Sequence, residues 1–270
     1  MITSSIVTYK TDIKELMIVV NCTLNSNISN LYIIDNSPTD DLKKISELSD
    51  KIEYIWGHGN IGYGRGHNIA INRSIQLNAS YHVVLNPDIL FDASVITHLS
   101  NYLDENPDVG HIMPLVKYPN GDIQFLCKLV PTPIDLLFKR FLPKDRIDKR
   151  MRKFQLQFTG YNKIMNVPYL SGCFMFLRIS VLRDIGLFDE RFFMYPEDVD
   201  LTRRIHQKYK TIFYPKVEII HAHAAESYQS KRMLWIHMTN MIKYFNKWGW
   251  FFDKKRTEIN RRVLSELKYK

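Results

Sequence analysis

Carboxylates gather at one point of this 270-residue chain, in the stretch RFFMYPEDVDLTRRIH at residues 191–206. Glu197, Asp198 and Asp200 stand there directly after a run of aromatic residues. One interpretation is structural, because Pro196 suits the first turn of a helix and carboxylates complement the positive end of the helix dipole. The other is chemical, because a positioned carboxylate can act as a general base toward a hydroxyl group. The other polar residues of the chain distinguish the two.

Polar side chains also stand where short apolar runs end. Asp35 ends the run YIID, and Asn86, Pro87 and Asp88 end the run VVLNPD. Turn chemistry explains each position taken alone, since Asn, Asp and Pro are the usual residues there. Ligands of parallel sheets, however, bind at the carboxyl ends of the strands. Together these residues predict an edge where two carboxylates can hold a nucleotide and its metal ion.

The stretch GHGNIGYGRGHN at residues 57–68 contains five glycines. A glycine-rich loop that leads into a helix can expose backbone N–H groups to a phosphate or allow a ribose to approach closely. No Gly-Lys-Ser/Thr follows, which excludes a Walker A loop, and the dinucleotide-binding fingerprint lacks its final glycine.

His221 and His223 belong to another apolar run, VEIIHAH. A histidine after a strand is most often a satisfied polar residue, and strand alternation places these two on one face. Hard divalent ions prefer carboxylate oxygen, and Mn²⁺ also accepts imidazole. Asp88 and one of the two histidines therefore form a candidate pair of metal ligands, with diphosphate oxygens completing the shell.

Alternating strand and helix patterns in the first half of the chain supply a scaffold for these residues. Strands are expected at residues 4–9, 30–36, 51–56, 81–86 and 109–116, and helices at residues 12–24, 40–49, 66–78 and 93–106. This alternation predicts an α/β fold with a mostly parallel, Rossmann-like central sheet and helices on both faces.

Beyond residue 117 the pattern changes. We expect a hairpin or turn at residues 118–125 and an irregular basic segment at residues 128–165. An apolar strand at residues 169–178 and a short helix at residues 180–186 should follow, and then two short strands at residues 211–215 and 217–223. The acidic helix precedes the last two strands, and the chain is helical from about residue 230. The sequence thus predicts a catalytic domain at residues 1–228 and a helical extension at residues 229–270.

The net charge of +9 is concentrated in two segments. Residues 231–270 carry a net +8 and residues 138–154 a net +6, which leaves a net −5 for the other 213 residues. A mildly acidic body with two basic patches differs from a uniformly basic nucleic-acid binder. We therefore expect no nucleic-acid partner.

The composition also bears on location. Cys22, Cys127 and Cys173 are odd in number and lack disulfide-framework or zinc spacing, which favours a reducing cytoplasm. No apolar run approaches the roughly 20 residues that span a bilayer, and the start MITSSIVTYK lacks the layout of a signal peptide. We expect a cytoplasmic protein.

In this order, the segments resemble the family 2 glycosyltransferases, inverting nucleotide-sugar enzymes of the GT-A fold. The resemblance covers about residues 1–225 and rests on SIVTYK, YIIDNSPTDDL, NIGYGRGHNIAIN, VLNPDI, YLSGCFMFLRISVLRDIGLFDERFFMYPEDVDLTRR and IIHAHAAES. The long block at residues 170–204 is its most specific part. Within the family, the sequence is most similar to the bacterial rhamnosyltransferase-like branch that builds surface polysaccharides.

The resemblance implies residues for the nucleotide. Thr8 and Asp35 would line a pyrimidine nucleotide pocket, with Asp35 accepting a hydrogen bond from the base. Asn60, Gly62 and Asn68 would border the nucleotide.

The resemblance also implies a metal site and a base. Asn86 to Asp88 match the Asp-x-Asp motif, in which Asp88 would contact a Mn²⁺ or Mg²⁺ ion. Asn86 replaces the first aspartate, which removes one anionic ligand and leaves Asn86 among the nucleotide-binding residues. His221 matches a metal-diphosphate histidine, a role that its neighbour His223 could exchange with it. Asp198 matches the catalytic base.

The resemblance therefore implies transfer of a sugar, rhamnose by the nearest branch, from a pyrimidine nucleoside diphosphate to a hydroxyl of a glycan or polyprenyl-linked glycan. Glu197 and Asp200 would then be helix-start and supporting residues. Rival interpretations are a non-catalytic nucleic-acid-binding or membrane-binding protein, a sugar nucleotidyltransferase, and an NAD-dependent oxidoreductase. The glycine loop argues against the last two, because it lacks the fingerprint and follows the third strand.

The basic tail interleaves aromatic residues with Lys and Arg. A packed helix pair with a solvated basic face explains this pattern. Amphipathic aromatics and cations also suit an anionic headgroup layer, which predicts peripheral contact with the inner face of the cytoplasmic membrane. The segment at residues 138–154 would cover the acceptor site or join that contact.

Overall fold

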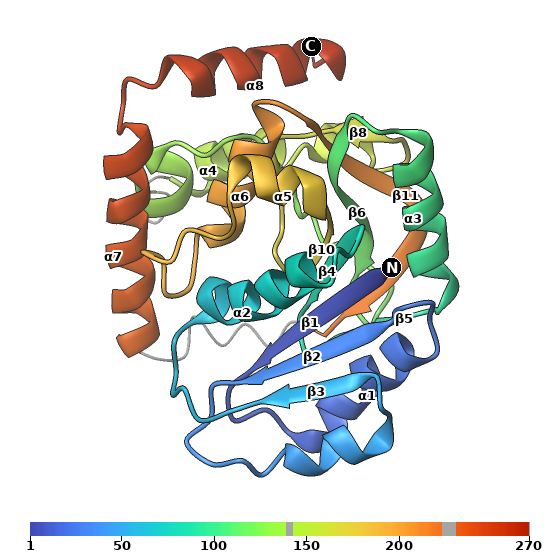
Figure 1. Cartoon of the computed structure of the whole chain (residues 1–270). Coiled ribbons are helices and arrows are strands. Elements are labelled where there is room, and N and C mark those ends of the chain that lie inside the picture. Colours follow the sequence, from blue (N-terminus) through green and yellow to red (C-terminus); the bar gives the residue numbers. More distant parts are fainter. Residues whose placement is uncertain (139–142, 223–230, 270) are drawn as a thin grey trace.

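The computed structural model describes residues 1–138, 143–222 and 231–269, and in it one large mixed sheet forms the centre of an α/β fold (Figure 1). The strand order in the sheet is β3-β2-β1-β4-β10-β6-β11-β5, and β8 pairs with β11. The strands are β1 (Ile2–Thr8), β2 (Asn30–Asp35), β3 (Ile52–Ile55), β4 (Tyr81–Leu85), β5 (Ile89–Phe91), β6 (Val109–Lys117), β8 (Met165–Asn166), β10 (Phe174–Arg178) and β11 (Lys210–His221). A separate two-stranded ladder joins β7 (Cys127–Lys128) and β9 (Tyr169–Leu170).

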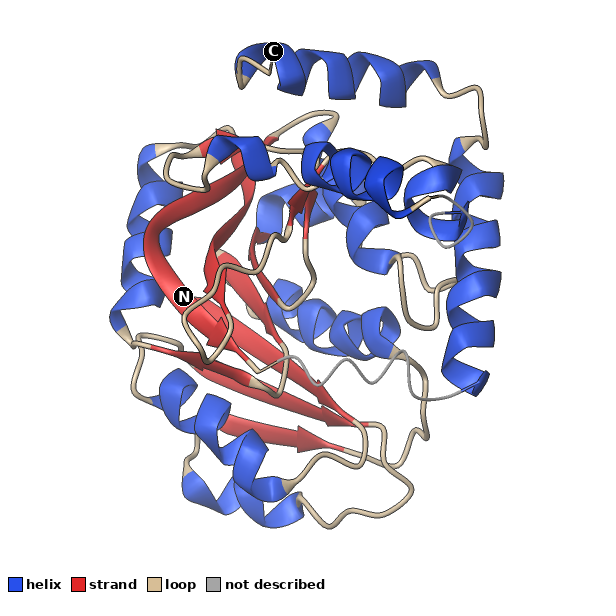
Figure 2. Ribbon diagram, turned by 180° about the vertical axis from the view of Figure 1, so that it is seen from behind, coloured by secondary structure: helices blue, strands red, loops and turns tan. Residues whose placement is uncertain are grey.

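Helices cover both faces of this sheet, as Figure 2 shows from behind. They are α1 (Ile13–Leu24), α2 (Tyr63–Gln76), α3 (Ser94–Glu105), α4 (Lys144–Phe154), α5 (Ile179–Ile185), α6 (Glu197–His206), α7 (Lys231–Trp248) and α8 (Lys254–Glu266). Shorter helical turns lie at Lys43–Leu48, Ile134–Phe138 and Gln157–Thr159. None of the helices in the described residues is long and apolar enough to cross a bilayer.

Strand alternation explains the two covered faces. In β1, Ile6 belongs to the cluster that contains Val19 of α1, whereas Val7 packs with Ala70 of α2 on the other side. Successive residues of a strand point to opposite faces, so a strand covered on both sides is apolar at consecutive positions. This arrangement confirms the predicted α/β class with helices on both faces.

The strands β1, β2, β3 and β4 pair in parallel, as predicted. The strand β10 departs from that pattern, because it inserts antiparallel between β4 and β6. Its register pairs Phe174 with Leu85, and the backbone N–H of Asn86 donates to Cys173 O at 2.9 Å. The end of β4 and the start of β10 therefore lie side by side.

Several predicted boundaries were wrong. The residues 40–49 form a short three-ten turn, and the segment expected to be irregular contains α4. The apolar run at residues 169–178 divides into β9 and β10, whereas the two late strands are one strand with an irregularity between Tyr214 and Glu218.

The helix α2 starts three residues earlier than predicted because its glycines serve close packing. A Cβ on Gly66 would lie 2.8 Å from Val7 Cγ2, so the missing side chain lets the helix approach the sheet. Gly62, which precedes the helix at φ +91°, instead needs the conformational freedom of glycine in the backbone.

The C-terminal helices pack on the rest of the chain. Met241, Tyr244 and Phe245 of α7 and Ile259 and Val263 of α8 belong to the main core cluster. Residues 231–269 therefore share their hydrophobic core with the sheet.

Histidines are buried inside the sheet. His82 lies within hydrogen-bond distance of Ser5 Oγ at 2.7 Å and Thr3 Oγ1 at 2.8 Å. Neither ring nitrogen of His111 has a hydrogen-bond partner among the described residues. Burial lowers the pKa of His82 and of His111 to about 3. Both side chains are therefore neutral in the folded protein at pH 5, where an unfolded histidine is protonated.

We predict that stability falls as the pH drops from about 6.5 toward 4, because the unfolded chain then binds more protons than the folded one. Replacement His111→Leu removes one such group and should reduce the slope of unfolding free energy against pH by about 1.4 kcal/mol per pH unit in that window. Urea denaturation at a series of pH values measures the slope. The control is His98→Gln at an exposed position of α3, and an unchanged slope in His111→Leu would contradict the prediction.

Candidate active site

Thr8 and Asp35 lie next to each other at the carboxyl ends of β1 and β2, where they are partners in the parallel register. Asp35 is fully buried, and its carboxylate accepts from Ser37 N at 2.8 Å and from Tyr54 Oη at 2.7 Å. The hydroxyl of Thr8 is buried and has no hydrogen-bond partner among the described residues. The predicted nucleotide pair is thus brought together, with one oriented carboxylate and one hydroxyl available to a ligand.

The glycine loop is tied to these strand ends through Asn36. The amide of Asn36 donates to Gly62 O at 3.2 Å, and its Oδ1 lies 3.0 Å from His58 Nε2. Asn60 accepts from Gly62 N at 3.2 Å. A Cβ on Gly62 would lie 2.3 Å from Phe193 O, so the loop packs closely on the segment that precedes α6.

Asn68 is used differently from the other predicted nucleotide residues. Its amide donates to Phe188 O at 2.9 Å and accepts from Phe188 N at 3.0 Å, with Glu190 as a further acceptor at 3.2 Å. These contacts hold the segment at residues 188–190 against α2. Among the described residues, no hydrogen bond joins the Asn68 side chain to Thr8 or Asp35.

Asp88 and His221 meet beyond the ends of β4 and β11. His221 Nε2 lies 3.3 Å from Asp88 Oδ1 and 3.4 Å from Asn86 Nδ2. The backbone supports the pair, since Ala222 N donates to Asp88 O at 3.0 Å. The other candidate, His223, lies outside the described residues. Within the described part of the chain, no group of three or more His, Cys, Asp or Glu side chains gathers as a metal site.

Gln124 orients the imidazole of His221. Its amide nitrogen donates to His221 O at 2.7 Å and reaches Lys117 O at 3.4 Å, which leaves its Oε1 directed at His221 Nδ1 at 2.9 Å. Two carbonyl acceptors fix which end of the amide carries the hydrogens. A neutral His221 therefore carries its proton on Nδ1 and turns a lone pair on Nε2 toward Asp88.

Tyr63 links this cluster to the acidic helix. Its hydroxyl lies 3.0 Å from Asn86 Oδ1 and 2.7 Å from Gly172 O. Gly172 N in turn donates to Asp198 Oδ2 at 2.9 Å. A chain of contacts thus runs from His221 through Asn86, Tyr63 and Gly172 to Asp198.

The acidic helix α6 begins at Glu197, with Pro196 as its N-terminal cap residue. Glu197 and Asp198 are both buried in its first turn. Burial, and then the charge of Asp198, raise the pKa of Glu197 to about 8. Burial also raises the pKa of Asp198, against the opposing effects of the Gly172 N–H and of the Lys128 charge. The first turn of α6 therefore contains two buried carboxyl groups whose proton affinities are both raised.

Asp200 is a structural residue of this helix. Its carboxylate accepts from Arg204 Nε at 2.8 Å, from Lys247 Nζ at 2.6 Å and from Trp248 Nε1 at 2.8 Å. These partners come from α6 itself and from α7. The Asp200 carboxylate is therefore occupied in joining two helices.

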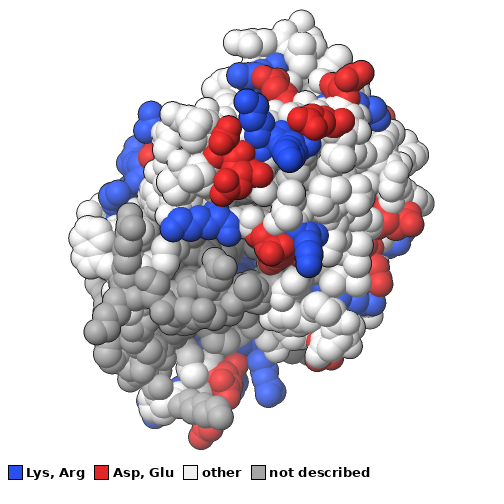
Figure 3. Space-filling model, turned by 90° about the horizontal axis from the view of Figure 1, so that it is seen from below, with Lys and Arg blue, Asp and Glu red and all other residues white. Residues whose placement is uncertain are grey.

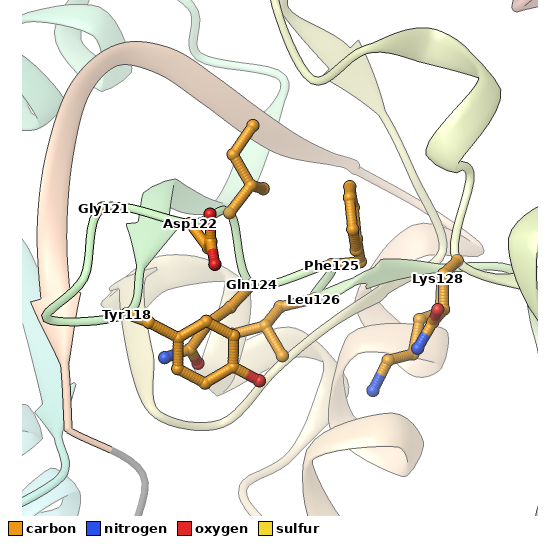
Figure 4. Close-up of a pocket in the computed structure, with 9 residues that line it drawn as sticks. Tyr118, Gly121, Asp122, Gln124, Phe125, Leu126 and Lys128 are labelled. Atoms are coloured by element: carbon orange, nitrogen blue, oxygen red, sulfur yellow. The ribbon is translucent and has the colours of Figure 1, made fainter.

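A pocket of about 650 Å³ opens beside the chain of contacts (Figure 4). It is lined by residues of the hairpin after β6, including Tyr118, Asp122 and Gln124, and by Lys128. Gln124 contacts His221, and Lys128 acts on the pKa of Asp198. Opposite parts of its wall thus belong to the His221 cluster and to the surroundings of Asp198.

Solved structures resemble this fold. The structure of GalNAc-T7 with UDP, GalNAc and Mn²⁺ aligns with a TM-score of 0.62 at 15% identity, over 82% of this chain and 42% of that one, so this chain spans less than half its length. A mannosyltransferase from Pyrobaculum calidifontis in complex with GDP-Man and Mn²⁺ aligns with a TM-score of 0.61 at 14% identity, over 99% of this chain and 70% of that one. These likenesses show the GT-A fold.

Sequence comparison identifies curated relatives. An N-acetylglucosaminyl-diphospho-decaprenol L-rhamnosyltransferase of Mycobacterium tuberculosis is 27% identical over 215 residues, which are 73% of this chain and 67% of that one. A low-salt glycan biosynthesis hexosyltransferase of Haloferax volcanii is 27% identical over 93% of this chain and 80% of its own length. The rhamnosyltransferase WbbL of Escherichia coli is 26% identical over 82% of this chain and 84% of its own length. The chain therefore has the GT-A fold, and the curated relatives that it resembles are glycosyltransferases. No protein-family model matches it.

Three residues of this GT-A site, Tyr63, Gln124 and Lys128, were not predicted. Tyr63 is the only aromatic residue of the glycine loop at residues 57–68, a signal that was available in the sequence. Gln124 and Lys128 gave no such signal, because their roles depend on how the hairpin after β6 folds back over β11.

We predict that Glu197→Gln stabilises this GT-A fold at high pH. The folded-state pKa of Glu197 is raised above the unfolded value, so its favourable contribution is full below about pH 4.5 and is lost as the pH rises toward about 8. The uncharged amide of the variant Glu197→Gln does not ionise, so the variant avoids this loss of stability at high pH. Its Tm should be higher than that of the parent protein by a few degrees at pH 8.5 and nearly equal at pH 4.5, since 1 kcal/mol corresponds to roughly 2–4 °C in a protein of this size.

Calorimetry of both proteins at the two pH values measures this effect. The matched control is Glu258→Gln at an exposed position of α8, which should leave the pH dependence as it is. An equal Tm for Glu197→Gln and the parent protein at pH 8.5 would contradict the assignment of a proton to buried Glu197.

Proposed function

We propose that the chain is an inverting glycosyltransferase that moves rhamnose from a pyrimidine nucleoside diphosphate to a hydroxyl of a glycan or lipid-linked glycan. The observation that carries this proposal is the run of contacts from His221 and Asp88 to Asp198. In this proposal, Asp88 and His221 hold a metal ion at one end of the run, and buried Asp198 is the base at the other end. Such a separation suits a reaction with a leaving group on one side of a sugar and a nucleophile on the other.

The donor set fits a divalent ion at Asp88 and His221. A carboxylate oxygen and an imidazole lone pair face each other at 3.3 Å, an arrangement that a cation between them relieves. Two of the aligned structures, GalNAc-T7 and the mannosyltransferase, contain Mn²⁺, which supports Mn²⁺ or Mg²⁺ here. When bound, such an ion would neutralise charge on the departing diphosphate.

Asn86 adds an oxygen to this set if its amide is turned over. Tyr63 has a single hydroxyl proton and two oxygens in reach, and Gly172 O, the nearer at 2.7 Å, can only accept. In the turned orientation the Asn86 nitrogen donates to Tyr63 Oη, and its oxygen joins Asp88 and His221. The amide that replaces the first aspartate of the motif would then remain a neutral ligand.

Asp198 is the proposed base. In a single displacement, the acceptor oxygen forms a bond to the anomeric carbon while the bond from that carbon to the diphosphate oxygen breaks. The proton of the acceptor hydroxyl passes to the Asp198 carboxylate, and the nucleoside diphosphate leaves. Both oxygens of Asp198 accept backbone N–H groups, whereas one buried oxygen of Glu197 has no hydrogen-bond partner among the described residues, so Asp198 is the proposed acceptor of the proton.

The pocket between Gln124 and Lys128 is the proposed entrance for the acceptor. The aromatic ring of Tyr118 and the polar groups of Asp122 and Gln124 suit a sugar, and Lys128 lies on the side of the base. The Mycobacterium tuberculosis relative is named for an acceptor on a decaprenyl diphosphate, which supports a lipid-linked acceptor here.

A nucleic-acid role gains no support from the lower face of the molecule. There Lys and Arg side chains are interspersed with Asp and Glu (Figure 3). A nucleic-acid binder would present a continuous basic surface along its ligand.

The variant Asp198→Asn tests the proposed function. Loss of the base should lower the transfer rate by about 10²–10⁴, while a nucleotide that binds only the folded state should still raise Tm. Transfer is measured with rhamnose nucleotides on an N-acetylglucosaminyl diphospholipid. Binding is measured by thermal shift with thymidine, uridine and guanosine diphosphates, each with and without Mn²⁺.

The matched control for Asp198→Asn is Asp184→Asn, which removes a partly exposed carboxylate paired with Lys208. The control should keep full transfer. If Asp198→Asn loses nucleotide binding and transfer alike, Asp198 is structural and the assignment of the base is wrong. Stabilisation by no pyrimidine diphosphate would contradict the proposed donor.

The variant Gln124→Met tests the proposed metal site without an activity assay. Removal of the side chain that orients a metal-ligating histidine typically weakens metal affinity about 10–100-fold. Titration of Mn²⁺ by electron paramagnetic resonance, with the bound diphosphate present, measures this affinity. Gln155→Met is the control, because Gln155 lines the same pocket but pairs with Gln157 instead of His221. Equal Mn²⁺ affinity in both variants would show that Gln124 does not act through His221.

A further inference from the structure

The outer side of α7 is apolar although it faces solvent. Leu234, Trp235 and Ile242 are exposed there, with 69% of the Trp235 side chain accessible. Trp235 and Ile242 are seven residues apart, which places them on one face of a helix. The opposite side buries Tyr244 and Phe245. Figures 1 and 2 both show α7 at the edge of the molecule, with no other described helix or strand outside it.

The turn between α7 and α8 continues this apolar surface. Phe251 is 68% exposed and Phe252 is 98% exposed, although neither position requires a large apolar residue for the turn itself. The backbone of the turn is held elsewhere, because Arg256 Nη2 donates to Trp250 O at 3.0 Å and to Phe251 O at 3.1 Å. Two phenyl rings are thus presented to the outside on a fixed turn.

Two exposed lysines follow the phenyl rings after the buried Asp253. Lys254 and Lys255 occupy the first turn of α8, where the positive end of the helix dipole makes cations unfavourable. Asp253 already caps this helix by accepting from Arg256 N at 2.9 Å. The cap of α8 therefore does not depend on these lysines; Lys255 reaches Gln207 Oε1 at 3.4 Å, and both cations remain exposed near Phe251 and Phe252.

We propose that the outer side of α7 and the Phe251–Phe252 turn form a docking surface for an anionic lipid bilayer. Phenyl and indole rings enter the boundary between headgroups and acyl chains, while adjacent lysines attract anionic headgroups. Residues 231–270 carry a net +8, which complements such a membrane. A soluble protein partner would not need aromatic residues followed by cations at the tip of a protruding turn.

The inner side of the same helix contacts the segment that leads to the carboxylates. Asn240 Nδ2 donates to Met194 O at 2.9 Å, and the ring of His237 lies 5.5 Å from the ring of Tyr195. Membrane and base would therefore lie on opposite sides of one helix, which is about 10 Å thick. This orientation rests on the proposed function, because it would bring the base close to a lipid-linked acceptor in the membrane.

The full chain is tested by co-sedimentation with phosphatidylcholine vesicles, with and without phosphatidylglycerol. The parent protein should bind the anionic vesicles in a salt-dependent manner. The double variant Phe251→Ser/Phe252→Ser and the variant Trp235→Ser should each bind about tenfold more weakly, a change of about 1.4 kcal/mol. Lys254→Gln/Lys255→Gln should lower binding and flatten its salt dependence.

The matched control is Leu48→Ser/Leu77→Ser, which removes two exposed apolar side chains away from α7 and α8. It should bind vesicles like the parent protein. Every variant is checked for unchanged Tm and for nucleotide-induced stabilisation, which separates lost docking from lost folding.

Transfer to a water-soluble acceptor and to a vesicle-bound acceptor separates this inference from the proposed function. The variant Phe251→Ser/Phe252→Ser should keep transfer to the water-soluble acceptor and lose most of the transfer to the vesicle-bound acceptor. If the aromatic variants bind vesicles as the parent protein does, the proposed docking surface is wrong. It is also wrong if the parent protein does not bind vesicles but forms a dimer that the same substitutions dissociate. Aromatic-dependent vesicle binding without transfer to either acceptor supports the docking surface and counts against the proposed function alone.

Discussion

The ion pairs that fix α6 are the interaction on which the rest of the site depends. Arg203 is buried and reaches Asp253 at 2.6 Å, while Asp200 binds Lys247 at 2.6 Å. A buried charge is costly once its partner is removed, so the C-terminal helices cannot separate from α6 without a large loss of stability. Because α6 carries Asp198 in its first turn, helices far from the sheet edge determine where the proposed base stands.

The site itself spans two parts of the fold that are distant in sequence. The nucleotide and metal candidates come from parallel strands in the first half and from the end of β11, whereas Asp198 comes with β10 and α6. The antiparallel insertion of β10 next to β4 joins the two parts, since it places Gly172 within reach of Tyr63. A purely parallel sheet would have provided the nucleotide edge without a base opposite it.

What could be predicted from the sequence follows from this division. The alternation of strand and helix patterns predicts the parallel strands and the helices on both faces. Asp88 and His221 were expected to meet because both stand where apolar runs end, and the ends of neighbouring strands lie at one edge of the sheet. Gln124 could not be found in this way, because YPNGDIQF carries only turn signals and its amide gains a role only beside His221. Asn68 shows the reverse case, since a polar residue next to glycines serves the backbone of Phe188.

The two carboxyl groups at the start of α6 bear on how the proposed base would act at neutral pH. A general base is most effective when its pKa lies near the working pH, which an isolated exposed aspartate does not achieve. Burial raises the proton affinity of both groups, and Glu197 has a buried oxygen without a hydrogen-bond partner among the described residues. The N–H groups of Gly172 and Val199 donate to the two oxygens of Asp198 and stabilise its ionised form. Asp198 is therefore the member of the pair that suits the proposed role of accepting a proton from an incoming hydroxyl.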